Sequence, residues 1–234
     1  MSYDIVIRGG EVIDPSQGMR QVCDVAISSG KVAAVQESID CSDATTVVDA
    51  RGQLVTPGLI DLHTHLSGDP GGDFRDAAVN PPEWYTLVAA KNARVTALAG
   101  FTTVRDLGSR SAQVSQSLRR ATAEGYVPGP RIVTAARGLA IVGGHGDTSG
   151  FRSDVNDLLS SGFTCTGPIE CSEKVRLASK NGADLIKITA TGGVLSVASS
   201  GQNAQFTEDE ISAIVDTARD YGFHVAAHAH GAEG

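Results

Sequence analysis

The chain has little of what marks a nucleic-acid-binding or membrane protein. Its 19 Lys and Arg residues are outnumbered by 27 Asp and Glu residues, which gives a formal net charge of −8 at pH 7. No basic cluster interrupts this acidic balance, so neither nucleic acid nor an anionic membrane surface is expected as a partner. No apolar run approaches the roughly 18 residues that a membrane-spanning helix needs. With 41% hydrophobic residues over 234 positions, the sequence predicts a soluble globular protein.

Cysteine is also scarce, and its spacing excludes the common metal-binding patterns. None of the four cysteines forms a Cys-x-x-Cys pair, and a Gly-Pro pair separates the last two: Cys23, Cys41, Cys165 and Cys171. The N-terminal segment Met1–Asp4 has no basic region, and its apolar stretch is too short for a signal peptide. We therefore expect reduced thiols and a cytoplasmic location.

The pattern of apolar residues changes at Pro57-Gly58. Residues 1–57 contain short alternating segments divided by turns, at Gly9-Gly10 and Ser28–Gly30, and this predicts a small antiparallel β domain. Residues 58–234 alternate between apolar runs and helical patterns. This alternation is typical of βα units around a parallel sheet, so we expect an α/β fold in the second domain.

Five strands and four helices are expected after residue 58. The strands lie near 59–65, 101–106, 131–136, 185–190 and 223–229, and the helices near 83–99, 111–124, 170–181 and 208–221. The last helix begins with a capping box, in which Thr207 and Glu210 satisfy free backbone N–H groups. Residues 137–168 are rich in Gly and Ser without a clear period, which predicts a long loop beside a site.

Five βα units are too few for the closed barrel that this pattern suggests. A (β/α)8 TIM-type barrel has eight strands, so residues 58–234 are expected to be its N-terminal part, truncated at the C-terminus. The complete protein would have about 400 residues. An open five-stranded sheet is the alternative, although it would place the histidine-rich strand 226–230 at a sheet edge.

His63 and His65 stand at the end of the apolar run 59–62. Side chains alternate along a strand, so both imidazoles point to one face, about 7 Å apart. Two neutral imidazoles in this arrangement form half of a site for a divalent transition metal. In isolation the pair could equally consist of strand histidines that only form hydrogen bonds, so the rest of the chain decides.

Lys187 lies in the middle of the fourth predicted strand. If Ile186 and Ile188 face the helices, Lys187 faces the barrel centre with Leu185 and Thr189. Three interpretations are open for a lysine in such a place. Its stem could pack while its ammonium reaches water, its amine could form a Schiff base, or it could be carbamylated by CO2 and bridge two metal ions. The His-x-His pair on the first strand favours the third.

Three histidines of the fifth predicted strand share one face. His224 begins the strand, where structural roles dominate, whereas His228 and His230 stand at its C-terminal end. Active sites of barrels lie at this end. A neutral imidazole there could bind metal if a second acceptor fixed its tautomer.

These motifs together resemble the amidohydrolase superfamily. The resemblance rests on Gly58–His65 in the first strand, on Ile186–Ile188 around the lysine, and on His228 in the fifth strand. The N-terminal segment, with Ile7–Gly10 and Val12–Asp14, resembles the small β-sandwich domain of the same superfamily. The resemblance thus implies a β-sandwich formed by the N-terminal strands, followed by a metal-dependent hydrolase barrel.

Three further segments resemble one branch of that superfamily: Gly143–Asp147, Gly182–Ile188 and Thr191–Val194. This is the prolidase-like branch, which includes Xaa-Pro and Xaa-Arg dipeptidases and N-acyl amino acid hydrolases. The resemblance implies a small-molecule substrate with an amide bond to a C-terminal amino acid. We also expect a homo-oligomer. The identity of the released amino acid stays open.

The resemblance implies a set of metal ligands. His63 and His65 would bind the more buried of two divalent metal ions, expected to be Zn2+, and Lys187 would bridge both ions in N6-carboxylated form. His228 would bind the second ion. The family pattern also contains a histidine after the sixth strand and an aspartate after the eighth, and both positions lie beyond Gly234.

Two histidines are expected to act on the substrate. His145, in the Gly-rich segment after the third strand, would hold the scissile carbonyl or the developing oxyanion, and His230 would contact the substrate. The alternative for His145 is a loop side chain that faces solvent. Arg105 and Asp106 are expected to form a structural ion pair, and Asp61 is also expected to be structural.

Other functions share parts of this pattern. Single-metal deaminases and imidazolonepropionase-like hydrolases have the two-domain plan but lack the bridging lysine, so Lys187 argues against both. Hydrolases of lactones or cyclic amides remain alternatives within the superfamily. A non-catalytic relative that acts as an assembly protein would be expected to lose its ligands, yet all four checkable positions are present.

Overall fold

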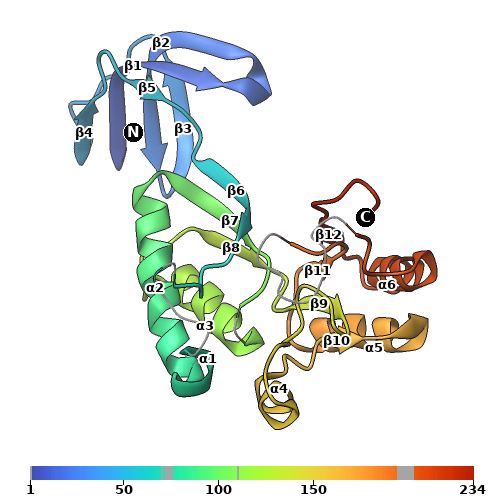
Figure 1. Ribbon diagram of the computed structural model, residues 1–234. Helices are drawn as coiled ribbons and strands as arrows, with labels where there is room; N and C mark the ends of the chain where they lie inside the picture. Colours follow the sequence, from blue (N-terminus) through green and yellow to red (C-terminus); the bar gives the residue numbers. More distant parts are fainter. Residues whose placement is uncertain (1, 70, 72–75, 110, 194–202) are drawn as a thin grey trace. The chain divides into compact units, whose positions relative to one another are not determined.

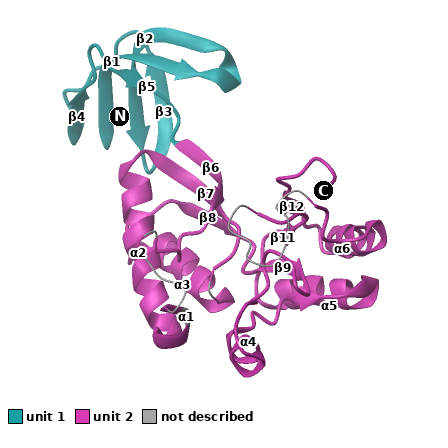
Figure 2. Cartoon of the chain, viewed as in Figure 1, with its two compact units in different colours: residues 1–58 teal, residues 59–234 magenta. Residues whose placement is uncertain are grey.

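The structure is a computed structural model that describes residues 2–69, 71, 76–109, 111–193 and 203–234. The chain divides into two compact units, Met1–Gly58 and Leu59–Gly234, coloured separately in Figure 2. No helix among the described residues is long and apolar enough to cross a membrane.

Unit 1 is a mixed five-stranded sheet. Its strands are β1 (Ile5–Asp14), β2 (Met19–Ser28), β3 (Lys31–Gln36), β4 (Thr46–Asp49) and β5 (Leu54–Val55), with the short 3-10 helix Pro15–Gln17 between β1 and β2. The first three strands pair antiparallel, whereas β4 and β5 pair in parallel with β1. The predicted antiparallel module is therefore only partly correct. After β3 the chain crosses to the other side of β1 and runs in the same direction as β1.

The predicted turn at Gly9-Gly10 is wrong. β1 continues through both glycines in a β-bulge, where its register with β2 shifts between Ile7 and Gly10. Gly9 has a φ of 68°, which a residue without Cβ adopts without strain. The turn predicted at residues 28–30 is present, because Ser29 and Gly30 both have positive φ, as two-residue hairpins require.

Apart from an isolated antiparallel bridge between Thr191 and Ala204, the described strands of unit 2 pair in parallel. They are β6 (Leu59–Thr64), β7 (Phe101–Asp106), β8 (Arg131–Thr134), β9 (Gly138–Ile141), β10 (Thr164–Cys165), β11 (Ile186–Thr189) and β12 (Val225–His228). They pair in two groups, in the orders β6-β7-β8 and β10-β9-β11-β12. The helices are α1 (Asp76–Val79), α2 (Pro82–Leu98), α3 (Ala112–Ala123), α4 (Ser153–Leu159), α5 (Gly167–Lys180) and α6 (Glu208–Asp220).

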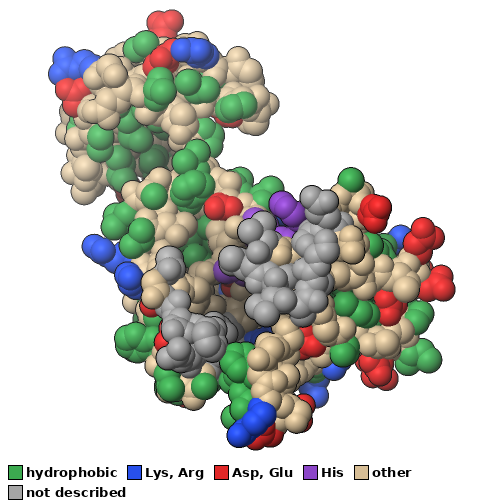
Figure 3. All heavy atoms as spheres, viewed as in Figure 1, with side chains coloured by type: hydrophobic (Ala, Val, Ile, Leu, Met, Phe, Trp, Pro, Cys, Tyr) green, Lys and Arg blue, Asp and Glu red, His purple; other side chains and the backbone are tan. Residues whose placement is uncertain are grey.

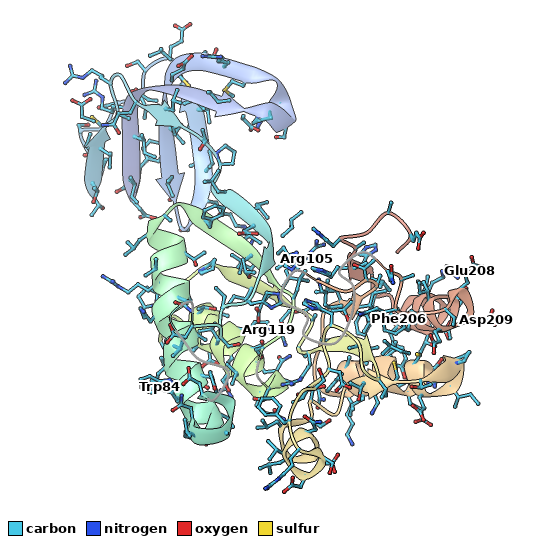
Figure 4. The ribbon with its side chains drawn as sticks, viewed as in Figure 1. Trp84, Arg105, Arg119, Phe206, Glu208 and Asp209 are labelled. Carbon is cyan, nitrogen blue, oxygen red and sulfur yellow. The ribbon has the colours of Figure 1, made fainter. Side chains whose placement is uncertain are left out.

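Asp184 joins the two groups of strands. Its backbone N–H donates to the Thr134 carbonyl oxygen at 2.8 Å, and its carboxylate accepts from the Thr134 N–H at 2.9 Å. Arg119 of α3, which is labelled in Figure 4, adds an ion pair to the same carboxylate at 2.6 Å. The segment just before β11 is thus bonded to β8 of the other group.

Two apolar cores hold the helices against these strands. In the first, Val104 and Ile132 pack with Ala89 of α2 and Leu118 of α3. In the second, the outward side chains of β11 pack with Val175 of α5 and Ile214 of α6. Figure 1 shows α2 and α3 beside β6–β8, and α5 and α6 beside β9–β12. The predicted α/β fold is confirmed.

Residues 137–168 were expected to form a loop, but they contain β9, α4 and β10. Leu139 and Ala140 are buried in β9, and this apolar run is too short to stand out in the sequence beside the glycine-rich residues 143–146. The capping box at Thr207 and Glu210 is present. The closed barrel and the two-layered β-sandwich remain predictions, since the described strands form the sheets given above.

Candidate active site

A cavity of about 250 Å³ lies in unit 2 at the C-terminal ends of the parallel strands. Its described lining consists of His63, His65, Leu107, Gly108, Ser109, Arg137, Gly138, His145, Gly146, Ser161, Lys187, Thr189 and His228. This lining holds basic side chains and imidazoles, and none of its described members is acidic. Figure 3 shows histidine side chains gathered on one face of unit 2.

Lys187 reaches the cavity from β11. Its neighbours Ile186 and Ile188 pack against the helices, so alternation along the strand turns the lysine inward, as predicted. Only 3% of the residue is exposed, and its Nζ has no hydrogen-bond partner among the described residues. Burial, and secondarily the charge of Arg105, lowers the pKa of Lys187 to about 8. Gly138 gives the lysine stem room, because a Cβ there would lie 3.3 Å from its Cγ.

His63 and His65 stand at the end of β6 with ring centroids 5.4 Å apart. The Nδ1 of His65 lies 2.9 Å from the Gly108 carbonyl oxygen, which leaves Nε2 for another ligand. Burial, then the charge of Lys187, lowers the pKa of His63. The backbone N–H of His63 donates to the Asp61 carboxylate at 2.9 Å, in keeping with the expected structural role of Asp61.

His145 and His228 stack on each other, with ring centroids 4.9 Å apart and planes inclined by 27°. The Nε2 of His228 is buried and has no hydrogen-bond partner among the described residues, although its ring also bonds to the Gly192 backbone. Desolvation lowers the pKa of both imidazoles. Both rings therefore favour the neutral form that binds metal or donates a single hydrogen bond.

The segment that carries His145 is tied to its surroundings at several points. The backbone N–H of His145 donates to Gln205 Oε1 at 2.9 Å, and that of Gly143 donates to the Asp147 carboxylate at 2.8 Å. Gly193 lies against the ring, since a Cβ there would approach the His145 Cε1 to 2.5 Å. His145 thus lies in the cavity wall rather than facing solvent. Of the predicted segment 191–194, Val194 lies outside the described residues.

One expectation near the strand ends is wrong, the ion pair between Arg105 and Asp106, whereas the substrate contact of His230 stays a prediction. His230 is exposed and is not part of the described cavity lining, and its backbone N–H donates to Thr191 Oγ1. Arg105 and Asp106 do not form the expected ion pair, because adjacent strand residues point to opposite faces. Arg105 Nε donates to the Leu62 carbonyl at 2.7 Å.

Asp106 has its own partners on the helix side of the sheet. Its carboxylate accepts from Ser115 Oγ at 2.6 Å and from the Leu66 N–H at 3.2 Å. Burial is the largest influence on this group and raises the pKa of Asp106.

Sequence reasoning missed several residues of the site, among them Arg137 and Gln205. Arg137 lines the cavity from the turn between β8 and β9, which had been predicted as the start of a loop. Gln205 holds the His145 segment from 60 residues further along the chain. Neither has a local sequence signal, because their positions depend on how distant segments meet.

The donor chemistry of the cavity fits divalent metal ions. No three His, Cys, Asp or Glu side chains form a ready metal cluster in the part of the chain that the structure describes. Yet the cavity lining includes two buried nitrogen atoms without partners, Lys187 Nζ and His228 Nε2. Such atoms are costly to bury unless another group completes their bonding. His65 adds a ring whose tautomer is fixed by a backbone carbonyl, as in many metal sites.

Comparison with known proteins places the chain in a group of hydrolases. Residues 54–234 match the profile described as the Amidohydrolase family. A crystal structure of a Xaa-Pro dipeptidase with bound methionine in the active site is 38% identical, with a TM-score of 0.86. A dihydroorotase of Geobacter sulfurreducens is 30% identical over 188 residues. An ochratoxinase of Aspergillus niger is 29% identical over 201 residues.

These matches span most of this chain but only part of each relative. The dipeptidase match covers 98% of this chain and 57% of that structure. The dihydroorotase match covers 75% of this chain and 39% of the relative, and the ochratoxinase match covers 79% and 41%. The chain thus spans about half the length of the solved structure, and a smaller share of the two curated relatives.

Proposed function

Because the chain belongs to the amidohydrolase family, we propose that it forms the metal-binding part of an enzyme that hydrolyses the amide bond to a C-terminal amino acid. The substrates would be dipeptides of the Xaa-Pro or Xaa-Arg kind, or N-acyl amino acids. The likeness to a Xaa-Pro dipeptidase supports this substrate class, and the active site of that relative holds methionine, a free amino acid.

One observation carries the proposal. Lys187 holds an amine nitrogen, buried and unpartnered among the described residues, in a cavity that three strand-end histidines also line. A lysine with a purely structural role would extend its ammonium to water or to a carboxylate. No carboxylate is present in the described cavity lining, and only 3% of the lysine is exposed. The arrangement suits a lysine whose nitrogen is modified and whose modified group binds metal ions.

We assign N6-carboxylation to Lys187. The neutral amine would attack CO2, a nitrogen–carbon bond would form, and one proton would leave to solvent. The product is an anionic carbamate, which reverses the sign of the charge at this position. The charge of Arg105, in β7, acts on Lys187, so the modification would replace repulsion by attraction.

His63, His65, the carboxylated Lys187 and His228 would hold two divalent ions of the zinc type. When bound, such ions would polarise the scissile carbonyl and lower the pKa of water, which supplies the nucleophile. The Gly108 carbonyl would keep the His65 proton on Nδ1, so that Nε2 binds metal.

His145 would donate a hydrogen bond to the substrate carbonyl oxygen as negative charge develops there. Its stacking on His228 and the hydrogen bond to Gln205 hold it in place before substrate arrives. His230 would contact the substrate from the segment after β12. The further histidine and aspartate that the family resemblance implies would complete the ligand set and transfer the proton to the leaving amine.

The remaining expectations form part of the same proposal. The division into a small β-sandwich domain, 1–57, and a barrel domain, 58–234, is close to the boundary between units 1 and 2. A closing barrel would cover Leu59, Ile60 and Leu62 of β6, which are 50%, 61% and 55% exposed. A cytoplasmic homo-oligomer is proposed as well.

A substrate screen with metal analysis tests the proposal. The natural protein, purified with its metal ions, would be assayed against libraries of dipeptides and N-acyl amino acids, beside lactones, aminopurines and dihydroorotate. We expect turnover of the amide substrates, about two equivalents of metal, loss of activity with a chelator, and recovery with Zn2+. Turnover restricted to lactones or to deamination would refute the substrate class.

Dihydroorotase activity is the second candidate, favoured by the 30% identity to the enzyme of Geobacter sulfurreducens. It would use the same metal ligands on a cyclic amide. Turnover of dihydroorotate without turnover of any dipeptide would decide for it. The 29% identical ochratoxinase is a reason to include ochratoxin in the same screen.

A further inference from the structure

Arg137 enters the cavity wall from a strained turn. Between β8 and β9 the chain makes a sharp step, in which the Arg137 N–H donates to the Ala135 carbonyl at 2.6 Å. Ala136, at the centre of the step, has a φ of 59°, a left-handed conformation that residues with a Cβ rarely adopt. Such a residue costs about 1–3 kcal/mol and is found mainly where the surroundings or a site require it.

The neighbouring backbone is shaped to accept this turn. Gly108, with a φ of 128°, lies so close that a Cβ on it would be 3.1 Å from the Gly138 nitrogen and 3.7 Å from the Arg137 carbonyl carbon. The Arg137 guanidinium donates through Nη1 to the Ser109 carbonyl at 3.3 Å. The side chain is therefore oriented along the cavity wall by the backbone on both sides of it.

The charge of the cavity indicates what this side chain would bind. Lys187 and Arg137 contribute the two cationic side chains of the described lining, and no described lining residue is an Asp or Glu. If Lys187 becomes an anionic carbamate, Arg137 is the permanent organic cation that remains in the described lining. A guanidinium presents its donors in a planar fork that matches a carboxylate.

Arg137 also borders a second hollow of about 210 Å³. Its other described lining residues are Asn80, Pro82, Tyr85, Ser111, Leu158, Leu159 and Ser160. The guanidinium thus stands where the cavity with the proposed metal ligands meets a mixed polar and apolar space. A C-terminal amino acid has these parts: an amide nitrogen at the scissile bond, a carboxylate next to it, and a side chain that needs room.

We propose that Arg137 binds the α-carboxylate of the substrate's C-terminal residue and so determines that the enzyme acts at a free C-terminus. This proposal rests on the function given above and adds its specificity-determining residue. The second hollow would receive the side chain of the same residue. Replacement of the carboxylate by a neutral carboxamide should then remove most of the binding.

The test measures preference for a carboxylate rather than activity alone. In the natural, metal-loaded protein, isothermal titration would compare the twenty L-amino acids with their carboxamides. Steady-state kinetics would compare the best amide substrate with its C-terminal carboxamide. Both comparisons would be repeated for Arg137→Met, Arg137→Lys and the control Arg152→Met, which removes an exposed arginine paired with Asp154.

For the natural protein we expect the carboxylate form to bind at least about 10-fold more tightly than the carboxamide. Arg137→Met should raise KM for the acid about 10- to 100-fold and bring the two forms to equal affinity, with a smaller change in kcat. Arg137→Lys should keep part of the preference, and Arg152→Met all of it.

Two results would overturn the proposal. One is a natural protein that binds carboxylates and carboxamides equally, and the other is an Arg137→Met variant that keeps the full preference. Because titration needs no turnover, it tests Arg137 even if the substrate screen fails. Amide hydrolysis without any effect of Arg137 would reject this inference and leave the proposed function intact.

Discussion

Two buried charged residues, one in each unit, differ in their hydrogen-bond partners. Asp24 in unit 1 is 4% exposed, and Lys187 in unit 2 is 3% exposed. Asp24 accepts hydrogen bonds from the Gly9 N–H at 2.8 Å and the Ile39 N–H at 3.0 Å, with the Arg8 guanidinium 3.9 Å away. Lys187 Nζ has no such partner among the described residues.

This difference suggests a structural role for the Asp24 carboxylate and a functional role for the Lys187 amine. The Asp24 carboxylate fastens the bulge of β1 to the segment after β3, so its burial holds together two parts of the sheet. Lys187 Nζ makes no comparable contact among the described residues of unit 2, and a buried amine without a partner is a cost to folding. A side chain that a fold keeps at such a cost is a candidate for function.

Removal of the lysine should therefore have the largest effect on activity and the smallest on folding. Lys187→Met retains the length of the stem and removes the amine, the proposed carbamate and the bridge between the ions. We expect hydrolysis to fall by about three or more orders of magnitude, with a melting temperature equal to or above that of the metal-free natural protein. Steady-state kinetics, bound metal content and thermal unfolding would be measured.

The matched control is Lys180→Met, at the exposed end of α5, which should leave all three measurements unchanged. A Lys187→Met variant with more than about a tenth of the natural rate would contradict the role given to the amine. Strong destabilisation of that variant would show instead that the lysine has a structural partner.

Asp24→Ala should have the reverse effects, a large loss of folding stability and no loss of hydrolysis. It leaves the N–H groups of Gly9 and Ile39 buried without an acceptor, and each such group costs about 1–3 kcal/mol. We expect a loss of about 2–5 kcal/mol in the free energy of unfolding of unit 1, with unchanged kcat per folded molecule. Denaturant titration gives the global value, and hydrogen exchange at these two amides gives the local one.

The exposed Asp43 supplies the control, since Asp43→Ala removes a carboxylate from the same unit without touching the bulge. If slow exchange at Gly9 and Ile39 survived in Asp24→Ala, the bulge would be held by the sheet rather than by the carboxylate.

Of the two buried charges, only the position of Lys187 could be predicted from the sequence. Strand alternation was enough to point Lys187 inward beside His63 and His65, because a strand of period two leaves few choices. The partners of Asp24 were not visible. They depend on a bulge at Gly9, where a glycine pair was interpreted as a turn, and on a segment that crosses the sheet to pair in parallel.

Arg137 shows the same limit within the site. Its place in the cavity depends on a left-handed alanine and on the close approach of Gly108, and neither follows from local propensity. The helices α2, α3, α5 and α6 were predicted to within a few residues, since their apolar faces repeat over several turns, whereas the short helices α1 and α4 were missed. Short buried elements such as β9 carry too few residues for a period to be recognised.

Asp106 offers an intermediate case, a buried carboxylate with a raised pKa. The folded state holds its proton more tightly than the unfolded chain does. The resulting stability is present below the unfolded pKa of about 3.9 and is lost as pH rises through the folded value. Asp106→Asn should therefore gain stability relative to the natural protein as pH rises through this window, by about 1.4 kcal/mol per unit of raised pKa.

Thermal unfolding of both proteins between pH 4 and 8 measures this difference. The opposite sign, with the natural protein gaining stability relative to Asp106→Asn as pH rises, would mean that the hydrogen bonds from Ser115 and Leu66 outweigh burial.

The smallest effect on stability and on hydrolysis is expected for a charged pair that is exposed and lies outside the candidate active site. Asp49 and Arg51 form an ion pair in unit 1 with side chains that are 59% and 79% exposed. The hydrogen bonds from Arg51 lower the pKa of Asp49 to about 2. A lowered pKa gives stability that is present above the unfolded value of about 3.9 and lost as pH falls toward 2.

Arg51→Gln should return the pKa of Asp49 toward 3.9, as followed by carboxyl NMR, without a measurable change in unfolding or hydrolysis at pH 7. A large loss of stability at pH 7 would show that an exposed ion pair, without burial, is enough to stabilise the fold of this protein.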